Sequence, residues 1–218
     1  MQRVFKIKKK ELISLIQSTK SFDNPKVTLE QYTIDAACAI DIIFFAGVEF
    51  DDIQRNLIVD LGAGTGRLSL SSAFLNPLRI LSIDVDPRAL AILRENLNLF
   101  QFENLILPLC MNVKNFGITP HFFNSFSKIT TIMNPPFGVQ KRGADRIFLE
   151  TAFMFSDVIY SIHLANKKVH KFITDYAYKH KWHVDYVLPY TMILEKTFPF
   201  HEQKRKEIEV NLYRFKKS

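Results

Sequence analysis

Three glycines stand at alternate positions in the segment Asp60-Leu61-Gly62-Ala63-Gly64-Thr65-Gly66, directly after a short apolar run at residues 56–59. An apolar run ended by glycines, with a helical pattern beginning near Arg67, is typical of a strand–loop–helix unit. Glycine lets the backbone turn tightly and approach a ligand, and the free N–H groups of the helix start attract polar groups. The segment therefore predicts a site for a nucleotide-like cofactor, with contacts from Asp60, Gly62, Gly64 and Gly66.

The next apolar run ends in Asp84-Val85-Asp86. A carboxylate at the tip of the second strand of such a fold can accept both hydroxyls of a ribose. Either Asp could instead cap the helix that starts at Pro87, because Asp before Pro is a good helix start. We assign Asp84 to the ribose and Asp86 to the cap. NAD is disfavoured, because Arg67 stands where the dinucleotide fingerprint has its third glycine.

A second motif, Asn134-Pro135-Pro136-Phe137-Gly138, follows the apolar run at residues 129–133. Two prolines remove two backbone donors, which leaves acceptor carbonyls beside the Asn134 amide and the aromatic ring of Phe137. The Asn134 side-chain oxygen and the Pro135 carbonyl could each accept one N–H of an exocyclic amine, while Phe137 stacks on the base. A proline-stiffened turn without chemistry is the alternative.

Strand-like and helical patterns alternate along the chain, which predicts an α/β fold with a mostly parallel sheet. Helices are expected near residues 8–18 and 34–46. The last two strands lack a clear helix between them, only residues 191–205, and are expected to form an antiparallel hairpin. We expect one domain over residues 1–218, with an N-terminal helix and the segment leading into the core at 1–28 and a catalytic core at 29–218. Strands are expected near residues 56–60, 79–84, 104–109, 129–133, 157–163, 183–190 and 207–215.

Charge is distributed unevenly in this chain of net charge +7. Residues 1–110 hold 12 Lys and Arg against 13 Asp and Glu, whereas residues 111–218 hold 17 against 9. Basic runs are commonly solvated faces. Here they gather in the half that contains the Asn-Pro-Pro-Phe motif, which favours contact with a phosphate backbone. Lys141 and Arg142, close after Phe137, are the first candidates for phosphate contacts.

Several protein classes find no support in the sequence. No apolar run is long enough to span a membrane, and the first residues lack a signal-peptide core, so we expect a cytoplasmic protein. Cys38 and Cys110 lie in apolar surroundings without CxxC spacing, so we expect two buried thiols, no disulfide and no metal site.

Taken together, these motifs resemble the Rossmann-like S-adenosylmethionine-dependent methyltransferases that modify amino groups. The chain is similar, from about Pro25 to Phe215, to the methyltransferase-like protein 5 family and its archaeal relatives, which methylate N6 of one adenine in small-subunit ribosomal RNA. The segments that carry this resemblance, besides the two motifs above, are Leu29-Glu30-Gln31-Tyr32, Gly143-Ala144-Asp145, Phe148-Leu149, Tyr160-Ser161-Ile162-His163, Phe200-His201 and the final run at residues 208–215.

The resemblance implies a seven-stranded sheet in the order 3-2-1-4-5-7-6, with strand 7 antiparallel and helices on both faces. It also implies cofactor contacts from Gln31 and Tyr32, and places His163 and His201 near the target base. Polar tips at strand ends are the alternative for both histidines. The family usually has an acid after the third strand, where this chain has Asn112; an amide can still accept from the adenine amine of the cofactor and donate to a ring nitrogen.

The predicted reaction needs positioning instead of a metal, because a sulfonium methyl is already activated. Acceptance of both N6 hydrogens by Asn134 and Pro135 would free the nitrogen lone pair, and no separate base is required. Three alternatives stay open: a glutamine N5-methyltransferase acting on protein, a DNA adenine methylase, and a non-catalytic module that binds cofactor and RNA.

The predicted third strand, residues 104–109, lies at a sheet edge in the order that the resemblance implies. It is apolar and carries no charge, so it invites strand addition unless something covers it. Pro108 or a covering helix could limit that pairing. Relatives of the family are activated by a small zinc-binding protein of the Trm112 type that adds a strand at this place. We therefore expect such a partner.

Overall fold

The computed structural model describes residues 8–116, 120–123, 125–140, 143–195 and 205–218. In this part of the chain seven strands form one sheet in the order β3-β2-β1-β4-β5-β7-β6, which confirms the prediction. Neighbouring strands among β1 to β5 pair in parallel, whereas β7 runs antiparallel to both β5 and β6. The strands are β1 (Leu57–Leu61), β2 (Arg79–Asp84), β3 (Ile106–Cys110), β4 (Ile129–Met133), β5 (Val158–Leu164), β6 (Trp182–Glu195) and β7 (Arg205–Lys217).

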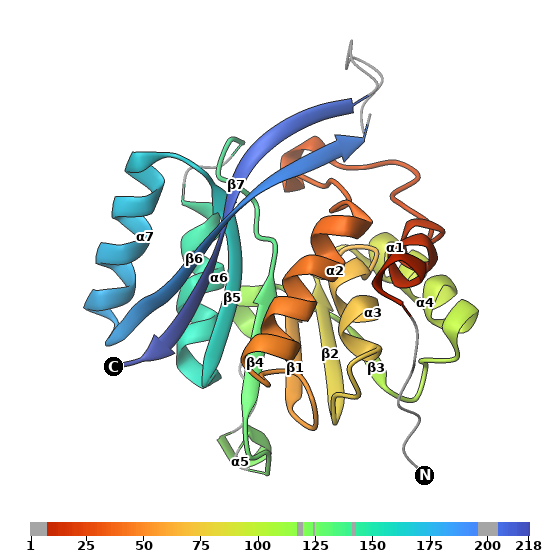
Figure 1. Cartoon of the computed structure of the whole chain (residues 1–218), viewed down its shortest axis with the longest axis horizontal. Helices are drawn as coiled ribbons and strands as arrows, with labels where there is room; N and C mark the ends of the chain where they lie inside the picture. The colour runs from red at the N-terminus through yellow and green to blue at the C-terminus, as the bar shows by residue number, and fades with distance from the viewer. Residues whose placement is uncertain (1–7, 117–119, 124, 141–142, 196–204) are drawn as a thin grey trace.

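Helices cover both faces of the sheet, as predicted. In Figure 1, α2 and α3 lie in front of β1 and β2, and their apolar sides join those of α1 and α4 in one core cluster. A second cluster on the other face includes side chains of α6 and α7. The helical segments are α1 (Lys9–Gln17), η1 (Val27–Leu29), α2 (Ala36–Phe44), η2 (Phe45–Glu49), α3 (Arg67–Ala73), α4 (Pro87–Phe100), η3 (Val113–Asn115), α5 (Pro120–Phe123), α6 (Ala144–Phe155) and α7 (Lys167–Lys179).

The central strands explain why the sequence reads as short apolar runs. All five residues of β1 and all five of β4 are buried, because crossover helices cover both sides of a parallel sheet. The carboxyl ends of these two strands lie side by side, with Leu61 paired to Met133. The glycine loop after β1 and the Asn-Pro-Pro-Phe motif after β4 therefore begin next to each other.

The β6–β7 hairpin is longer than predicted, since β6 continues to Glu195, into the segment 191–205 that we expected to be a connection. Side chains at alternate positions from Leu188 to Leu194 pack on the first core cluster, and Met192 among them is fully buried. The Ile193 N–H donates to the Asp35 carboxylate at the start of α2, at 3.1 Å. The hairpin thus crosses the sheet and covers the beginning of α2 (Figure 1).

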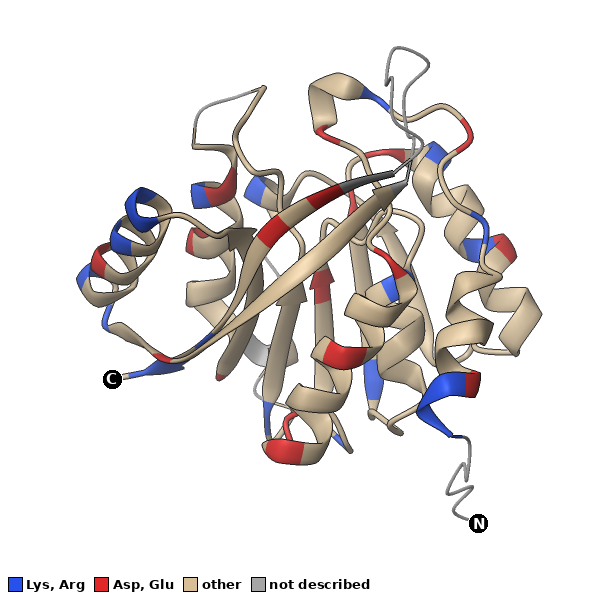
Figure 2. Ribbon diagram, turned by 45° about the horizontal axis from the view of Figure 1, so that its top comes forward, with Lys and Arg blue, Asp and Glu red and all other residues tan. Residues whose placement is uncertain are grey.

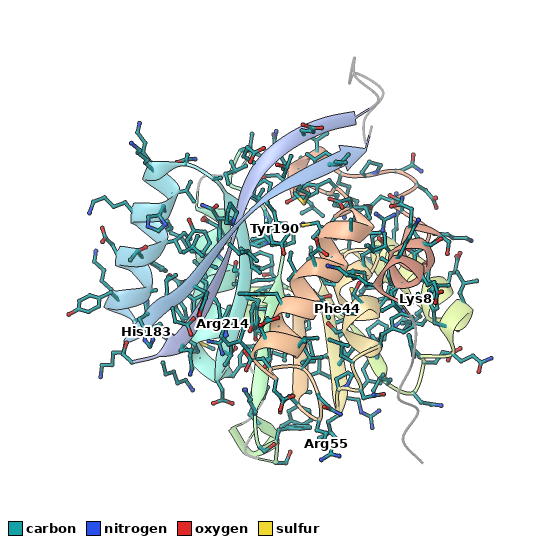
Figure 3. All side chains as sticks on the ribbon, in the orientation of Figure 1. Lys8, Phe44, Arg55, His183, Tyr190 and Arg214 are labelled. Carbon is teal, nitrogen blue, oxygen red and sulfur yellow. The ribbon has the colours of Figure 1, made fainter. Side chains whose placement is uncertain are left out.

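A buried ionic network fastens this hairpin to the parallel half of the sheet, at the amino end of β1. Asp52 is fully buried and accepts from Arg214, from the Tyr160 hydroxyl at 2.5 Å and from Lys128. Arg214, labelled in Figure 3, donates to Asp52 through Nε at 2.9 Å and Nη2 at 2.8 Å, and to Asp185 through Nη1. The network lies at the sheet edge opposite the loops after β1 and β4, so it supports the fold and not the site.

Two expectations about side chains have different outcomes. Cys38 is buried as predicted, but Cys110 is exposed, because it ends the edge strand β3, where no further strand covers it in the described structure.

Among the described residues, no helix has both the length and the apolar character needed to cross a bilayer. The same residues contain no group of three or more His, Cys, Asp or Glu side chains placed to hold a metal ion.

Candidate functional site

A cavity of about 310 Å³ lies at the carboxyl ends of β1, β2 and β4, the edge where ligands bind in open α/β sheets. It brings together residues 22–34 before α2, which we call the lead-in, the glycine loop, the ends of β2 and β4, the segment after β3 and one side of α6. Its lining residues are Phe22, Thr28, Leu29, Glu30, Gln31, Tyr32, Thr33, Ile34, Gly62, Ala63, Gly64, Thr65, Arg67, Leu68, Asp84, Val85, Asn112, Val113, Lys114, Asn134, Pro136, Ala144, Ile147 and Phe148.

Two glycines of the loop form part of the cavity wall, and both need to be glycine. Gly62 has φ of 75° and Gly64 has φ of 55°, in the left-handed region that favours this residue. A Cβ on Gly62 would lie 2.9 Å from the Phe148 ring, and one on Gly64 would lie 3.0 Å from the Phe22 ring. Glycine at both positions therefore lets an aromatic ring lie directly against the loop backbone in the cavity wall.

Two other predicted cofactor contacts, Asp60 and Gly66, do not line the cavity. A Cβ on Gly66 would lie 2.1 Å from the side chain of Leu93, so this glycine allows α4 to pack against the loop. Asp60 is fully buried and its Oδ2 accepts from the Ser69 hydroxyl at 2.5 Å. Burial raises the pKa of Asp60 to about 7, although the bond from Ser69 favours its charged form. Both residues shape the loop from behind.

Asp84 lines the cavity at the end of β2, where we predicted a ribose-binding acid. Its Oδ2 accepts the Gly64 N–H and its Oδ1 accepts the Asp86 N–H, both at 2.8 Å. Burial raises the pKa of Asp84, and these backbone bonds partly oppose the shift. Asp86 caps α4 as predicted, since its Oδ1 accepts the Arg88 N–H at 3.2 Å and Pro87 opens the helix.

The lead-in segment joins both sides of the cavity through two neighbouring side chains. Glu30 Oε1 accepts the Gln140 N–H at 2.7 Å, beyond the loop after β4. Gln31 Nε2 donates to Asp86 Oδ2 at 2.9 Å, and its Oε1 accepts the Lys26 N–H at 2.7 Å. Gln31 lines the cavity as a predicted cofactor residue should, yet both ends of its amide already have protein partners. In this structure Gln31 holds the lead-in against Asp86, the acid that follows β2.

Asn134 and Pro136 line the cavity, whereas Pro135 is buried behind them. The Tyr32 hydroxyl donates to Asn134 Oδ1 at 2.9 Å. The ring of Tyr32 stacks on that of Phe137, with centroids 5.5 Å apart and an interplanar angle of 29°. Phe137 does not line the cavity itself. Tyr32 therefore already contacts the predicted acceptor Asn134 and the predicted stacking residue Phe137.

Asn112 lies in the cavity wall after β3, at the predicted position. It begins η3, and its Oδ1 accepts the Lys114 N–H at 3.0 Å. An amide oxygen has two lone pairs, so this bond leaves one for a ligand, together with the donors of the amide nitrogen.

His163 is buried at the end of β5 and does not line the cavity. Its Nε2 lies 2.7 Å from the Ser161 hydroxyl, and its Nδ1 lies 3.9 Å from Asp145 Oδ2 at the start of α6. Burial lowers the pKa of His163 to about 3, so the ring is neutral at physiological pH. The other predicted substrate residues lie outside the described part of the chain: Lys141, Arg142 and His201.

Sequence reasoning missed the aromatic walls of the cavity. Phe22 and Phe148 face the two glycines from the lead-in and from α6, segments that are distant along the chain. Spacing could not reveal such contacts, because they arise only after the elements pack. The one available signal was the Phe148-Leu149 pair within the family resemblance.

A family model for the TRM5/TYW2 methyltransferase domain matches residues 49–138. This span runs from before β1 to the end of the Asn-Pro-Pro-Phe-Gly motif, so it contains the glycine loop, Asp84 and Asn134.

Proteins similar to the whole chain extend this match. An uncharacterised protein of Methanocaldococcus jannaschii is 35% identical over 217 residues, covering 97% of this chain and 95% of that protein. The rRNA N(6)-adenosine-methyltransferase METTL5 of Danio rerio is 35% identical over 213 residues, covering 96% and 99%. The crystal structure of a Pyrococcus horikoshii protein superposes with a TM-score of 0.86 at 37% identity, covering 100% and 98%. The chain belongs to the methyltransferase-like protein 5 (METTL5) family.

Proposed function

We propose that this chain transfers a methyl group from S-adenosylmethionine to N6 of an adenosine in small-subunit ribosomal RNA. The observation that carries the proposal is the Asn134 amide, which forms part of the wall of a cavity built on a glycine loop. Relatives from Danio rerio, Drosophila melanogaster and Caenorhabditis elegans that match nearly the whole chain are named as rRNA N6-adenosine methyltransferases.

The residues of the cavity fit S-adenosylmethionine. Each Asp84 oxygen has one backbone donor and keeps a lone pair, so the carboxylate can accept two ribose hydroxyls. Gly62 and Gly64 line the same cavity with bare backbone, and the Asn112 amide in its wall can pair with an adenine edge. When bound, the sulfonium supplies a methyl group that needs no further activation.

The loop after β4 would hold the target amine. Asn134 lines the cavity, and its side-chain oxygen would accept one N6 hydrogen; the carbonyl of Pro135, a residue that is buried in this structure, would accept the other. Together they would draw the nitrogen toward a pyramidal geometry and free its lone pair. The same acceptors stabilise the positive charge that develops on nitrogen, and they do so more strongly in a dry site. Pro136 keeps the loop free of a competing donor, and Phe137 offers its ring to the base. The base must first leave its stack, at a cost of about a few kcal/mol.

The basic half of the chain supports an RNA substrate. Exposed lysines lie along α7 (Figure 2). This helix begins just after β5, at the same edge of the sheet as the loop after β4. Lys167, Lys168 and Lys171 lie in its first turns, where they could contact phosphates on either side of the flipped nucleotide. We retain Lys141 and Arg142 as the nearest candidates. An rRNA target is consistent with a cytoplasmic enzyme.

A partner at the edge of the sheet is a second part of the proposal. Among the described strands β3 pairs with β2 alone, and Leu107 of β3 and Leu99 of the neighbouring α4 are 39% and 63% exposed. An apolar edge of this kind favours strand addition. We propose that a small zinc-binding protein of the Trm112 type covers β3. Light scattering of the mixed proteins should show a one-to-one complex that Leu107→Lys abolishes; a fully active monomer, unaffected by that change, would exclude it.

The alternatives differ in substrate and not in acceptor chemistry. Glutamine N5 methylation would use the same two acceptors, but the basic half and Phe137 favour a nucleic acid. A DNA adenine methylase would be expected to carry a sequence-reading region, and the described residues form none outside the methyltransferase fold. A non-catalytic module would have no need of Asn134.

The decisive experiment is mass spectrometry of nucleosides after incubation of small-subunit rRNA with the purified protein and methyl-labelled cofactor, with and without the zinc-binding partner. The expected product is labelled N6-methyladenosine, absent with Asn134→Ala. Labelled glutamine in ribosomal proteins instead would establish the protein substrate. Absence of any labelled nucleoside in both conditions would refute the RNA proposal.

A further inference from the structure

Tyr32 contacts Asn134, which we propose as an acceptor for the target amine, and Phe137, which we propose stacks on the base. Its hydroxyl lies 2.9 Å from Asn134 Oδ1, and its ring stacks on Phe137 with centroids 5.5 Å apart. Tyr32 precedes α2, so a segment remote in sequence supplies the side chain that touches the acceptor loop.

The orientation of the Asn134 amide decides whether it can serve as an acceptor. The amide has an oxygen that accepts and a nitrogen that donates, and the two ends have nearly the same shape. A target amine with two hydrogens needs the amide oxygen as its acceptor. If the amide were turned round, its NH₂ group would face the amine, and two donors would then oppose each other. A hydroxyl that donates to Oδ1 fixes the amide with its oxygen on the side of Tyr32 and leaves the second lone pair for the amine.

Tyr32 is itself held firmly enough to act in this way. Gln31 is anchored to Asp86 at 2.9 Å, and Glu30 accepts the Gln140 N–H at 2.7 Å. Burial raises the pKa of Tyr32 well above its ordinary value, so the hydroxyl keeps its proton and stays a donor at physiological pH. Neighbours on both sides of the cavity therefore fix the position of its ring and hydroxyl.

We propose that Tyr32 is a positioning residue for methyl transfer. Its hydroxyl orients the Asn134 amide with the oxygen available to the target amine, and its ring holds Phe137 in place for the base. This role rests on the proposed transfer to an exocyclic amine.

The first test is Tyr32→Phe, which keeps the ring and removes the donor. A hydrogen bond of ordinary strength corresponds to a fall in kcat of about tenfold. The KM for RNA and the Kd for S-adenosylmethionine, measured by calorimetry, should stay within about twofold of wild type. Tyr32→Leu also removes the stacked ring, so it should raise the KM for RNA as well.

A rescue experiment separates orientation from general support of the fold. In the Asn134→Asp background both side-chain oxygens accept, so there is no orientation left to fix. Tyr32→Phe should then reduce kcat by less than about twofold relative to Asn134→Asp alone. A second readout needs no turnover: the NMR order parameter of the Asn134 side-chain amide should fall in Tyr32→Phe, while that of Asn96, a buried amide bonded to Lys20 and Thr65, should not change.

The outcomes distinguish this inference from the proposed function. Unchanged kcat in Tyr32→Phe, or an unchanged order parameter, overturns the positioning role although N6 methylation stands. Higher activity in Tyr32→Phe or Tyr32→Leu also overturns it, because Tyr32 would then be an occupant of the base site that substrate must displace. If wild type forms no N6-methyladenosine, the proposed function fails, and the order parameter alone decides whether Tyr32 orients the amide.

Discussion

The two halves of the cavity are built in different ways. The cofactor half consists of backbone turns at the ends of β1 and β2, where Gly62 and Gly64 expose the main chain and Asp84 is held by two backbone N–H groups. The acceptor half consists of side chains that meet one another, with Tyr32 bonded to Asn134 and stacked on Phe137. The first half is fixed by local geometry, whereas the second depends on a contact between distant segments.

This difference predicts that the halves can be damaged separately. A backbone turn held by bonds to the neighbouring strand, such as that from the Gly64 N–H to Asp84, keeps its shape when an acceptor side chain changes. The acceptor side chains depend on the lead-in segment, which in turn is tied to Asp86 beside the cofactor half through Gln31. Damage to the acceptor half should therefore affect transfer alone, and damage to the cofactor half should affect cofactor affinity or folding.

The largest expected effect comes from Asn134→Ala. Removing one acceptor that stabilises charge in the transition state should reduce kcat by about 100-fold or more. The Kd for S-adenosylmethionine should change by less than about threefold, because Asp84 and the glycines remain. Asn98→Ala, an exposed amide on α4, serves as the matched control and should leave both quantities unchanged. Equal losses of binding and transfer would show that the two halves are not separable.

Gly66→Ala should destabilise the cofactor half without removing a residue that lines the cavity. Gly66 has φ of 93°, and a Cβ there would lie 2.1 Å from Leu93. Left-handed strain together with overpacking predicts a loss of about 3 kcal/mol in the free energy of unfolding, measured by urea denaturation. Gly143→Ala is the control: its φ is 75°, but its nearest contact is the flexible Arg146 side chain at 3.4 Å. That change should cost only about 1–2 kcal/mol; equal losses would mean that contact with Leu93 is unimportant.

Asp84→Ala tests whether the buried acid binds ligand or only supports the loop. Loss of the acceptor for two ribose hydroxyls should raise the apparent dissociation constant for the cofactor by about 10- to 100-fold. Transfer should recover at saturating cofactor, since the acceptor half is intact. The change also leaves the Gly64 and Asp86 N–H groups without their acceptor, so thermal unfolding must be measured in parallel. Failure of saturating cofactor to restore transfer would assign Asp84 a structural role.

The same contrast explains what the sequence could predict. The mostly parallel sheet follows from the alternation of patterns, whereas its strand order follows from the family resemblance. The Asp86 cap follows from one residue and its neighbours. By contrast, the Tyr32–Asn134 bond joins residues 102 positions apart, which no local pattern encodes. Gly66 carried the signature of a ligand-binding glycine, but only the packed structure shows that Leu93 occupies the space beside it.

The expectations that differ from the structure also have a tertiary cause. β6 continues past residue 190 because alternate side chains such as Met192 find the core under the hairpin. Cys110 is apolar in context but exposed, since it ends a strand at the sheet edge. Burial depends on which element packs above a residue, and a short apolar run does not reveal that.

The smallest effect, and the last comparison between the halves, concerns the buried ionisable group behind each. Asp60 lies behind the glycine loop with a pKa raised to about 7 by burial. His163 lies beside the start of α6 with a pKa lowered to about 3 by burial. Between the ordinary pKa of Asp and pH 7, the folded state holds a proton on Asp60 that the unfolded state has lost. The contribution of Asp60 to the free energy of unfolding is therefore present at low pH and is lost as pH rises toward 7. For His163 the unfolded state binds the extra proton below about pH 6.5, so its stability is present above that pH and is lost as pH falls.

The two contributions therefore oppose each other between about pH 5 and 6, and wild type should show little net slope from this pair. Asp60→Asn leaves the His163 term, so its free energy of unfolding, relative to wild type, should rise by about 1 kcal/mol from pH 5 to pH 6. In His163→Asn only the contribution of Asp60 remains, so its free energy of unfolding, relative to wild type, should fall by a similar amount from pH 5 to pH 6. Asp23→Asn, at an exposed position, is the control and should follow wild type. Urea denaturation at the two pH values measures all four proteins, and parallel slopes in the two core variants would show that these groups do not titrate as their burial predicts.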